Sequence, residues 1–198
     1  MTDLTRRDAL AALAAAAGTT AVFACGPAEV DRATREAARA KAGGRFNPRF
    51  FTPHELASAT LLADMILPRD ERSGGASDAG VPEFLDFVLA EEMTDPVRIR
   101  GGLAWLDAEC TERFGRRFVE ADESQRAHVL DDIAWPGRAA PQFSQGAAFF
   151  TAFRDLVASG FWSSKVGVED LGYRGNVPVA EWTGCPEEQL RKLGVTYG

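Results

Sequence analysis

The feature that most constrains the fold is a helix-start signal followed by apolar residues at helical spacing. Thr52-Pro53-His54-Glu55 is a capping box with proline at the first helical position. The pattern ends at Pro68, which cannot continue a helix. Between these points the apolar residues recur three and four positions apart, at Leu56, Ala59, Leu62, Ala63 and Ile66. The segment therefore predicts a helix with one face in a core.

Similar patterns along the chain predict further helices. Their expected starts are Pro82, Asp95-Pro96, Asp122 and Phe143, the last of these helices runs to Ser159, and a short final helix covers 186–193. Gly101-Gly102 lies inside the helix that follows Asp95, at a cost of about 1 kcal/mol per glycine relative to alanine. A close helix crossing would justify that cost.

Strand signals are weak throughout the chain. Val and Ile are sparse, and no apolar alternation extends beyond a few residues. The sequence thus predicts an all-α fold, a single helical domain of about five to six helices with a long irregular C-terminal segment, preceded by an export signal.

The irregular segment covers residues 161–186, FWSSKVGVEDLGYRGNVPVAEWTGCP. It has no helical or strand period, and it is rich in aromatic residues and glycine. Exposed aromatic surface forfeits about 25 cal/mol per Å² of burial free energy. We expect the segment to wrap either its own domain or a partner.

The first 24 residues predict an export signal. Arg6 and Arg7 precede an uncharged, apolar run over 9–24, which is shorter than the roughly 20 residues of a membrane span. The adjacent arginines resemble a twin-arginine signal, which serves proteins exported in folded form. Val22-Phe23-Ala24-Cys25 resembles a lipobox, with lipid attached to Cys25, and ordinary cleavage after Ala24 is equally compatible. We expect a periplasmic protein, either free or anchored by a lipid on Cys25.

The predicted domain organisation is a signal over 1–24, a charged tether over 25–48 and the helical domain over 49–198. Residues 29–44 intersperse alanine with charged residues and show no apolar face. We expect a solvated helix there that lifts the domain away from the export or membrane end.

Composition and motifs argue against several classes of function. A net charge of −7 and a pI of about 5.0 argue against nucleic-acid binding. The chain has no GxGxxG, GxxxxGK[ST], CxxCH or GxSxG motif. His54 and His128 form no metal-binding pair, and Asp131-Asp132 and Glu91-Glu92 are adjacent residues that do not face each other on a helix. We therefore expect no catalytic, cofactor-binding or metal-binding residue, although a Ser/His/acid triad of a hydrolase stays open.

Two cysteines, Cys110 and Cys185, remain after the signal, too few for an iron–sulfur cluster. In an oxidising compartment they can pair with each other, which would tie the C-terminal segment to the helix that holds Cys110. One of them can instead bridge to a partner chain, or both can be buried thiols. The sequence leaves these three alternatives open.

Several motifs together resemble subunit 3, the gamma subunit, of the gluconate 2-dehydrogenase family. The resemblance covers roughly 51–194. The motifs are Arg6-Arg7, the stretch FTPHELASATLLADMILP with the loop Gly75-Ala76-x-x-Ala79-Gly80-Val81-Pro82, and Leu171-Gly172-Tyr173-x-Gly175-Asn176 followed by Trp182-x-Gly184-Cys185-Pro186.

The resemblance implies a non-catalytic small subunit without a cofactor of its own. Its partner would be a flavin-dependent catalytic subunit of the glucose–methanol–choline type, often with a multihaem cytochrome c subunit, so that FAD and haem belong to the partners. The small subunit would stabilise the catalytic subunit and escort it through the twin-arginine translocase. The substrate stays open among gluconate, glucose, other sugars or sugar acids and other alcohols.

Within this interpretation, Tyr173, Asn176 and Trp182 are the candidate interface with the catalytic subunit. The alternative for Tyr173 and Trp182 is that they cover the helical core. A different class of function, a stand-alone periplasmic lipoprotein that acts as a binding module without an oxidoreductase partner, also fits the sequence.

Overall fold

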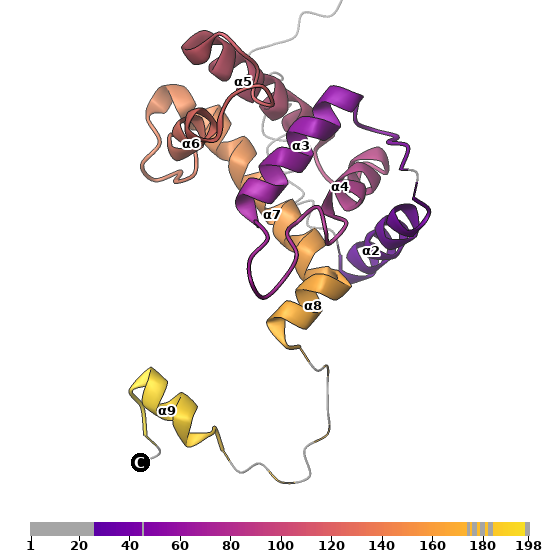
Figure 1. Ribbon diagram of the computed structural model, residues 1–198, viewed down its shortest axis with the longest axis vertical. Helices are drawn as coiled ribbons and strands as arrows, with labels where there is room; N and C mark the ends of the chain where they lie inside the picture. Colours follow the sequence, from indigo (N-terminus) through magenta and orange to yellow (C-terminus); the bar gives the residue numbers. More distant parts are fainter. Residues whose placement is uncertain are drawn as a thin grey trace, which may run out of the picture.

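The computed structural model describes residues 26–44, 46–173, 175, 178, 181 and 184–196. Within this part of the chain all regular structure is helical, as predicted (Figure 1). The elements are α2 (Pro27–Ala42), α3 (Pro53–Ile66), α4 (Val81–Ala90), α5 (Pro96–Phe114), α6 (Glu123–Asp131), the 3₁₀ turn η1 (Pro141–Phe143), α7 (Ser144–Ser163), α8 (Lys165–Leu171) and α9 (Glu187–Leu193).

The helices begin where the local signals place them. At α3 the Glu55 N–H donates to Thr52 Oγ1 over 3.2 Å, and the Thr52 N–H donates to Glu55 Oε2 over 2.8 Å. Asp95 caps α5 by accepting the Arg98 N–H over 3.0 Å. These bonds satisfy backbone donors that the first helical turn leaves without a partner. The expected starts of α3, α5 and α6 are confirmed to the residue.

The core is built around α7, which contacts α2, α3, α4, α5 and α8. Figure 1 shows this helix running through the middle of the body. Its buried aromatic residues are Phe149, Phe150, Phe153 and Phe161. Burial of such large apolar side chains is the dominant favourable contribution to folding.

The crossing of α5 and α7 depends on Gly102. A Cβ at this position would lie 1.9 Å from Phe149 Cδ2, so only glycine allows the two helices to approach this closely. A Cβ at Gly101 would meet nothing within 4 Å. The expected close crossing is therefore found at Gly102 and not at its neighbour.

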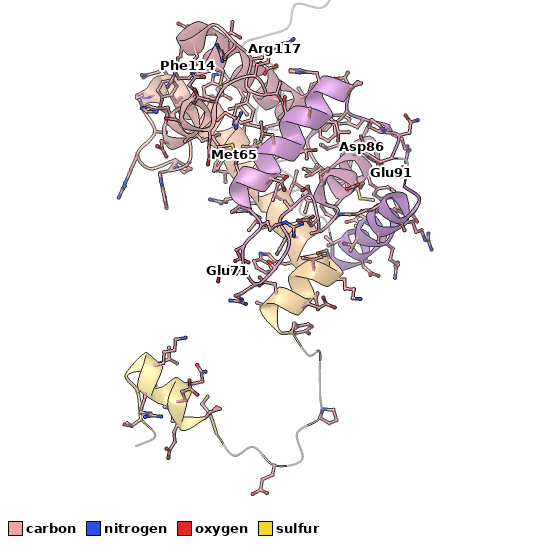
Figure 2. The ribbon with its side chains drawn as sticks, viewed as in Figure 1. Met65, Glu71, Asp86, Glu91, Phe114 and Arg117 are labelled. Carbon is pink, nitrogen blue, oxygen red and sulfur yellow. The ribbon has the colours of Figure 1, made fainter. Side chains whose placement is uncertain are left out.

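The prediction that residues 29–44 have no apolar face is wrong. Ala33 and Ala37, one turn apart on α2, are 0% and 4% exposed and pack on α4 and α7. Arg32 pairs with Glu91 at the end of α4 over 3.2 Å, and Figure 2 labels Glu91. Alanine side chains are small enough to form a buried face that a strongly apolar pattern would not reveal. Whether the stretch 25–48 also acts as a tether stays a prediction.

A buried carboxylate fixes the chain between α2 and α3. Asp86 on α4 is 2% exposed (Figure 2). Its Oδ2 accepts the Arg49 N–H over 2.8 Å, and its Oδ1 accepts the N–H groups of Phe50 and Phe51 over 3.0 Å each. Buried polar groups need such partners, and here they are three consecutive backbone donors. The contact seats Phe51 in the core.

The irregular segment predicted over 161–186 is helical in its first part, which corrects that expectation. α7 continues to Ser163, and α8 covers Lys165–Leu171. The 3.6-residue period is obscured there because the chain turns sharply at Ser164 after less than a full helical repeat. α9 lies apart from the other helices in Figure 1, and none of its residues is buried.

No helix in the described part of the chain is long and apolar enough to cross a membrane.

Candidate functional site

Exposed apolar side chains occur at the end of α8. Leu171 is 62% exposed and Tyr173 61% exposed. Both belong to the Leu171-Gly172-Tyr173 motif, and Trp162 at the end of α7 is also exposed. Aromatic residues on a surface are typical anchors of protein interfaces.

The corner between α7 and α8 sets the direction of α8. The buried Ser164 Oγ donates to the Phe161 carbonyl over 2.7 Å and accepts the Gly167 N–H over 3.1 Å. A Cβ at Gly167 would lie 2.1 Å from the Phe161 carbonyl oxygen, so no other residue fits there. The corner is thus defined by bonds and sterics inside the body, independent of any partner.

The far end of α8 is closed by a left-handed glycine. Gly172 has φ of 67°, its N–H donates to the Glu169 carbonyl over 3.0 Å, and the Tyr173 N–H donates to the Val168 carbonyl over 3.2 Å. This is the bonding of a Schellman cap, in which a residue with positive φ ends the helix. The cap leaves Leu171 and Tyr173 exposed on either side of Gly172.

A residue that the sequence did not single out contacts this end. Arg72, in the loop between α3 and α4, donates through Nη2 to the Asp170 carbonyl over 2.8 Å and lies 3.2 Å from Asp170 Oδ1. Arg72, Ser73, Gly74, Val166, Glu169 and Asp170 line a groove of about 460 Å³. Because Arg72 and Asp170 are 98 positions apart, no local pattern could have predicted this contact.

A second groove, of about 570 Å³, lies between the chain before α3, the end of α4 and the start of α5. Its lining includes Val97, which is 80% exposed, and two arginines. Arg49 pairs with Glu91 over 2.9 Å, and Arg100 pairs with Glu55 over 2.8 Å and lies over the Phe50 ring at 4.2 Å. These pairs neutralise both guanidinium groups, so the groove does not gather charge for a small anion.

The two histidines lie apart from each other in function as in sequence. His54 Nε2 lies 2.5 Å from Asp107 Oδ2, and Asp107 Oδ1 accepts the Phe118 N–H over 3.0 Å, so this pair ties α3 to α5 and to the chain before α6. His128 contacts the Ser124 carbonyl within its own helix. Among the described residues no three His, Cys, Asp or Glu side chains gather in a way that could hold a metal ion.

The two cysteines have different surroundings. Cys110 is fully buried in α5, and burial, helped by the nearby Asp107 carboxylate, raises the pKa of its thiol. Cys185 is exposed on the segment before α9. Their pairing stays a prediction, and it would require the C-terminal segment to reach into the body.

The other predicted site residues cannot be placed. Arg6, Arg7, Cys25, Asn176 and Trp182 lie outside the described residues. Of the three candidate interface residues only Tyr173 is therefore located, and Leu171 and Arg72 are added to it by the structure.

Comparison with known proteins gives one finding. The family model described as "Gluconate 2-dehydrogenase subunit 3" matches residues 53–181, from the start of α3 to beyond the end of α8. Neither the search of curated proteins nor the search of solved structures found a match.

Proposed function

Because the chain belongs to the gluconate 2-dehydrogenase subunit 3 family, we propose that it is the small, non-catalytic subunit of a flavin-dependent sugar or sugar-acid dehydrogenase complex. Its role is to bind the catalytic flavoprotein subunit, to stabilise it and to escort it through the twin-arginine translocase. FAD, and haem where a cytochrome c subunit is present, belong to the partner subunits.

The observation that carries the proposal is the exposed Leu171-Gly172-Tyr173 turn inside the family-matched stretch. Both flanking side chains are more than half exposed on a corner that the protein's own bonds hold in place. A preorganised apolar contact loses little entropy on binding, which favours affinity. A turn of this kind suits docking to a folded subunit.

The interface is tested by Tyr173→Ala, with Trp135→Ala as the matched control. Trp135 is a 65% exposed aromatic residue in the loop after α6, away from α8. The tagged protein is purified from its native cells, and the copurified flavoprotein is quantified by its flavin absorbance. We expect Tyr173→Ala to reduce recovery about tenfold or more, as loss of an interface anchor does, with the melting temperature unchanged.

Equal recovery with Tyr173→Ala and Trp135→Ala would remove Tyr173 from the interface. A wild-type chain that recovers no flavoprotein would contradict the subunit role itself, and would favour a binding module without an oxidoreductase partner.

The escort role is tested separately by Arg6→Lys combined with Arg7→Lys. We expect both this chain and the flavoprotein to stay in the cytoplasm, because the paired arginines are what the translocase recognises. The measurement is flavoprotein content in periplasmic and cytoplasmic fractions. A flavoprotein that still reaches the periplasm would show that this chain does not carry it.

A further inference from the structure

We propose that Arg72 is a positioning residue, which holds the last turn of α8 in the orientation that presents Leu171 and Tyr173 to the catalytic subunit. The inference rests on the proposed function, and it assigns a role to a loop for which composition alone predicted only a polar connection. Three sets of contacts carry it.

First, the loop from Arg69 to Gly80 is a braced platform. The Ser77 N–H donates to Asp64 Oδ1 on α3 over 2.8 Å, and Lys41 on α2 donates to the Ser77 carbonyl over 2.6 Å. Within the loop, Asp78 accepts the Gly75 N–H over 2.8 Å and the Arg69 guanidinium over 2.6 Å. The loop is thus fixed to two helices and to itself before it reaches α8.

Second, the backbone at Arg72 is held by a local turn. Asp70 Oδ1 accepts the N–H groups of Arg72 and Ser73 over 2.8 Å each. The bonds from Ser73 and Arg72 lower the pKa of the Asp70 carboxyl, so it stays ionised and keeps the turn at neutral pH. The base from which the Arg72 side chain extends is therefore well defined.

Third, the guanidinium completes the end of α8. The last four carbonyls of a helix have no partner within it. The Gly172 and Tyr173 N–H groups bond the Glu169 and Val168 carbonyls, and Arg72 bonds the next one, that of Asp170. A cation at a helix C-terminus is also favoured by the helix dipole.

The contact contributes to geometry more than to global stability. The Arg72 side chain is 73% exposed, and exposed ion pairs contribute only about 0–1 kcal/mol. Its bonds end on the turn that directly precedes the exposed pair, Leu171 and Tyr173. Loss of Arg72 should therefore release the last turn of α8 while the body stays folded.

The experiment compares Arg72→Ala with Arg72→Lys and with Arg154→Ala. Lysine keeps the charge and one donor but loses the planar fork, and Arg154 is an exposed arginine of α7 that pairs with its neighbour Asp155. Two quantities are measured on the full mature chain. One is hydrogen exchange of the Gly172 and Tyr173 amides, and the other is recovery of flavoprotein from native cells.

For Arg72→Ala we expect amide exchange at Gly172 and Tyr173 to rise about tenfold through local opening, flavoprotein recovery to fall and the melting temperature to stay unchanged. Arg72→Lys should fall between wild type and Arg72→Ala, and Arg154→Ala should match wild type.

Unchanged exchange at Gly172 and Tyr173 would show that Arg72 does not hold the turn. Faster exchange with undiminished flavoprotein recovery would show that the orientation of the turn does not matter for the complex. A wild-type chain that recovers no flavoprotein would overturn the proposed function, and with it the positioning role, while the exchange measurement would still report whether Arg72 holds α8.

Discussion

Single residues decide how closely the helices of this protein pack, and Gly102 is the clearest case. We predict that Gly102→Ala destabilises the mature protein by about 1–3 kcal/mol or more, because the added methyl group meets the Phe149 ring in a filled core. Gly101→Ala, one residue away on the exposed side, should be neutral or stabilise by up to about 1 kcal/mol. Urea unfolding followed by circular dichroism gives both values. Equal effects of the two variants would contradict the observed crossing.

A second prediction at this scale concerns pH and Glu55. Partial burial tends to raise the pKa of this carboxyl, but the hydrogen bonds with Thr52 and the charge and hydrogen bond of Arg100 outweigh it and lower the pKa. A carboxyl whose pKa is lower in the folded state stabilises the fold above its unfolded pKa of about 4.3, and this stabilisation is lost as the pH falls through the folded pKa.

Glu55→Gln keeps the capping box and removes the charge. We therefore expect this variant to be less stable than wild type at pH 7, with a difference that shrinks as the pH is lowered toward 3. Glu123→Gln, in the exposed first turn of α6, provides the matched control. The free energy of unfolding in urea at several pH values is the measurement, and a difference for Glu55→Gln that does not shrink at acid pH would contradict the prediction.

At the scale of the element, α2 is part of the folded body although it lies outside the family-matched stretch. Its sequence is polar because its buried face consists of alanines, and hydropathy gives alanine little weight. The contact became visible only when α4 and α7 were placed against it. Length and charge pattern described the helix correctly, and its role in the core followed from the tertiary contact.

We predict that Ala37→Gln destabilises the protein by about 1–3 kcal/mol, because a longer polar side chain is forced into a packed interface. Ala38→Gln places the same side chain on the exposed face of the same helix and should have little effect. Thermal unfolding distinguishes them, since 1 kcal/mol corresponds to about 2–4 °C in a protein of this size. A control variant that unfolds as early as Ala37→Gln would show that α2 does not pack as described.

At the scale of the whole molecule, the remaining question is how the C-terminal segment relates to the helical body. In the structure Cys110 is enclosed in the body, and its raised pKa disfavours the reactive thiolate. We predict that Cys110 of the folded mature protein resists a maleimide at pH 7 and becomes labelled in urea without a reductant. Peptide mass spectrometry locates the label. Labelling in urea only after reduction would instead show that Cys110 forms a disulfide, and the partner peptide would tell whether Cys185 is bonded to it.

Much of the secondary structure could be predicted because its causes lie within a few residues of each other. Thr52 with Glu55, Asp95 with Arg98 and Asp122 with Gln125 are caps three residues apart, so the starts of α3, α5 and α6 are local facts. The motif Leu171-Gly172-Tyr173 likewise indicated the family and the place of an interface candidate, although the helices around it were missed.

By itself, then, the sequence determined the helical class, most helix starts and the family. Only the tertiary structure decided which of two adjacent glycines is indispensable, that the alanines of α2 form a buried face, that Asp86 holds the chain before α3 and that Arg72 completes α8. The reason is physical. Caps and turns are bonds between near neighbours, whereas packing and the ties of Asp86 and Arg72 join residues tens of positions apart, and their partners are defined only once the chain has folded.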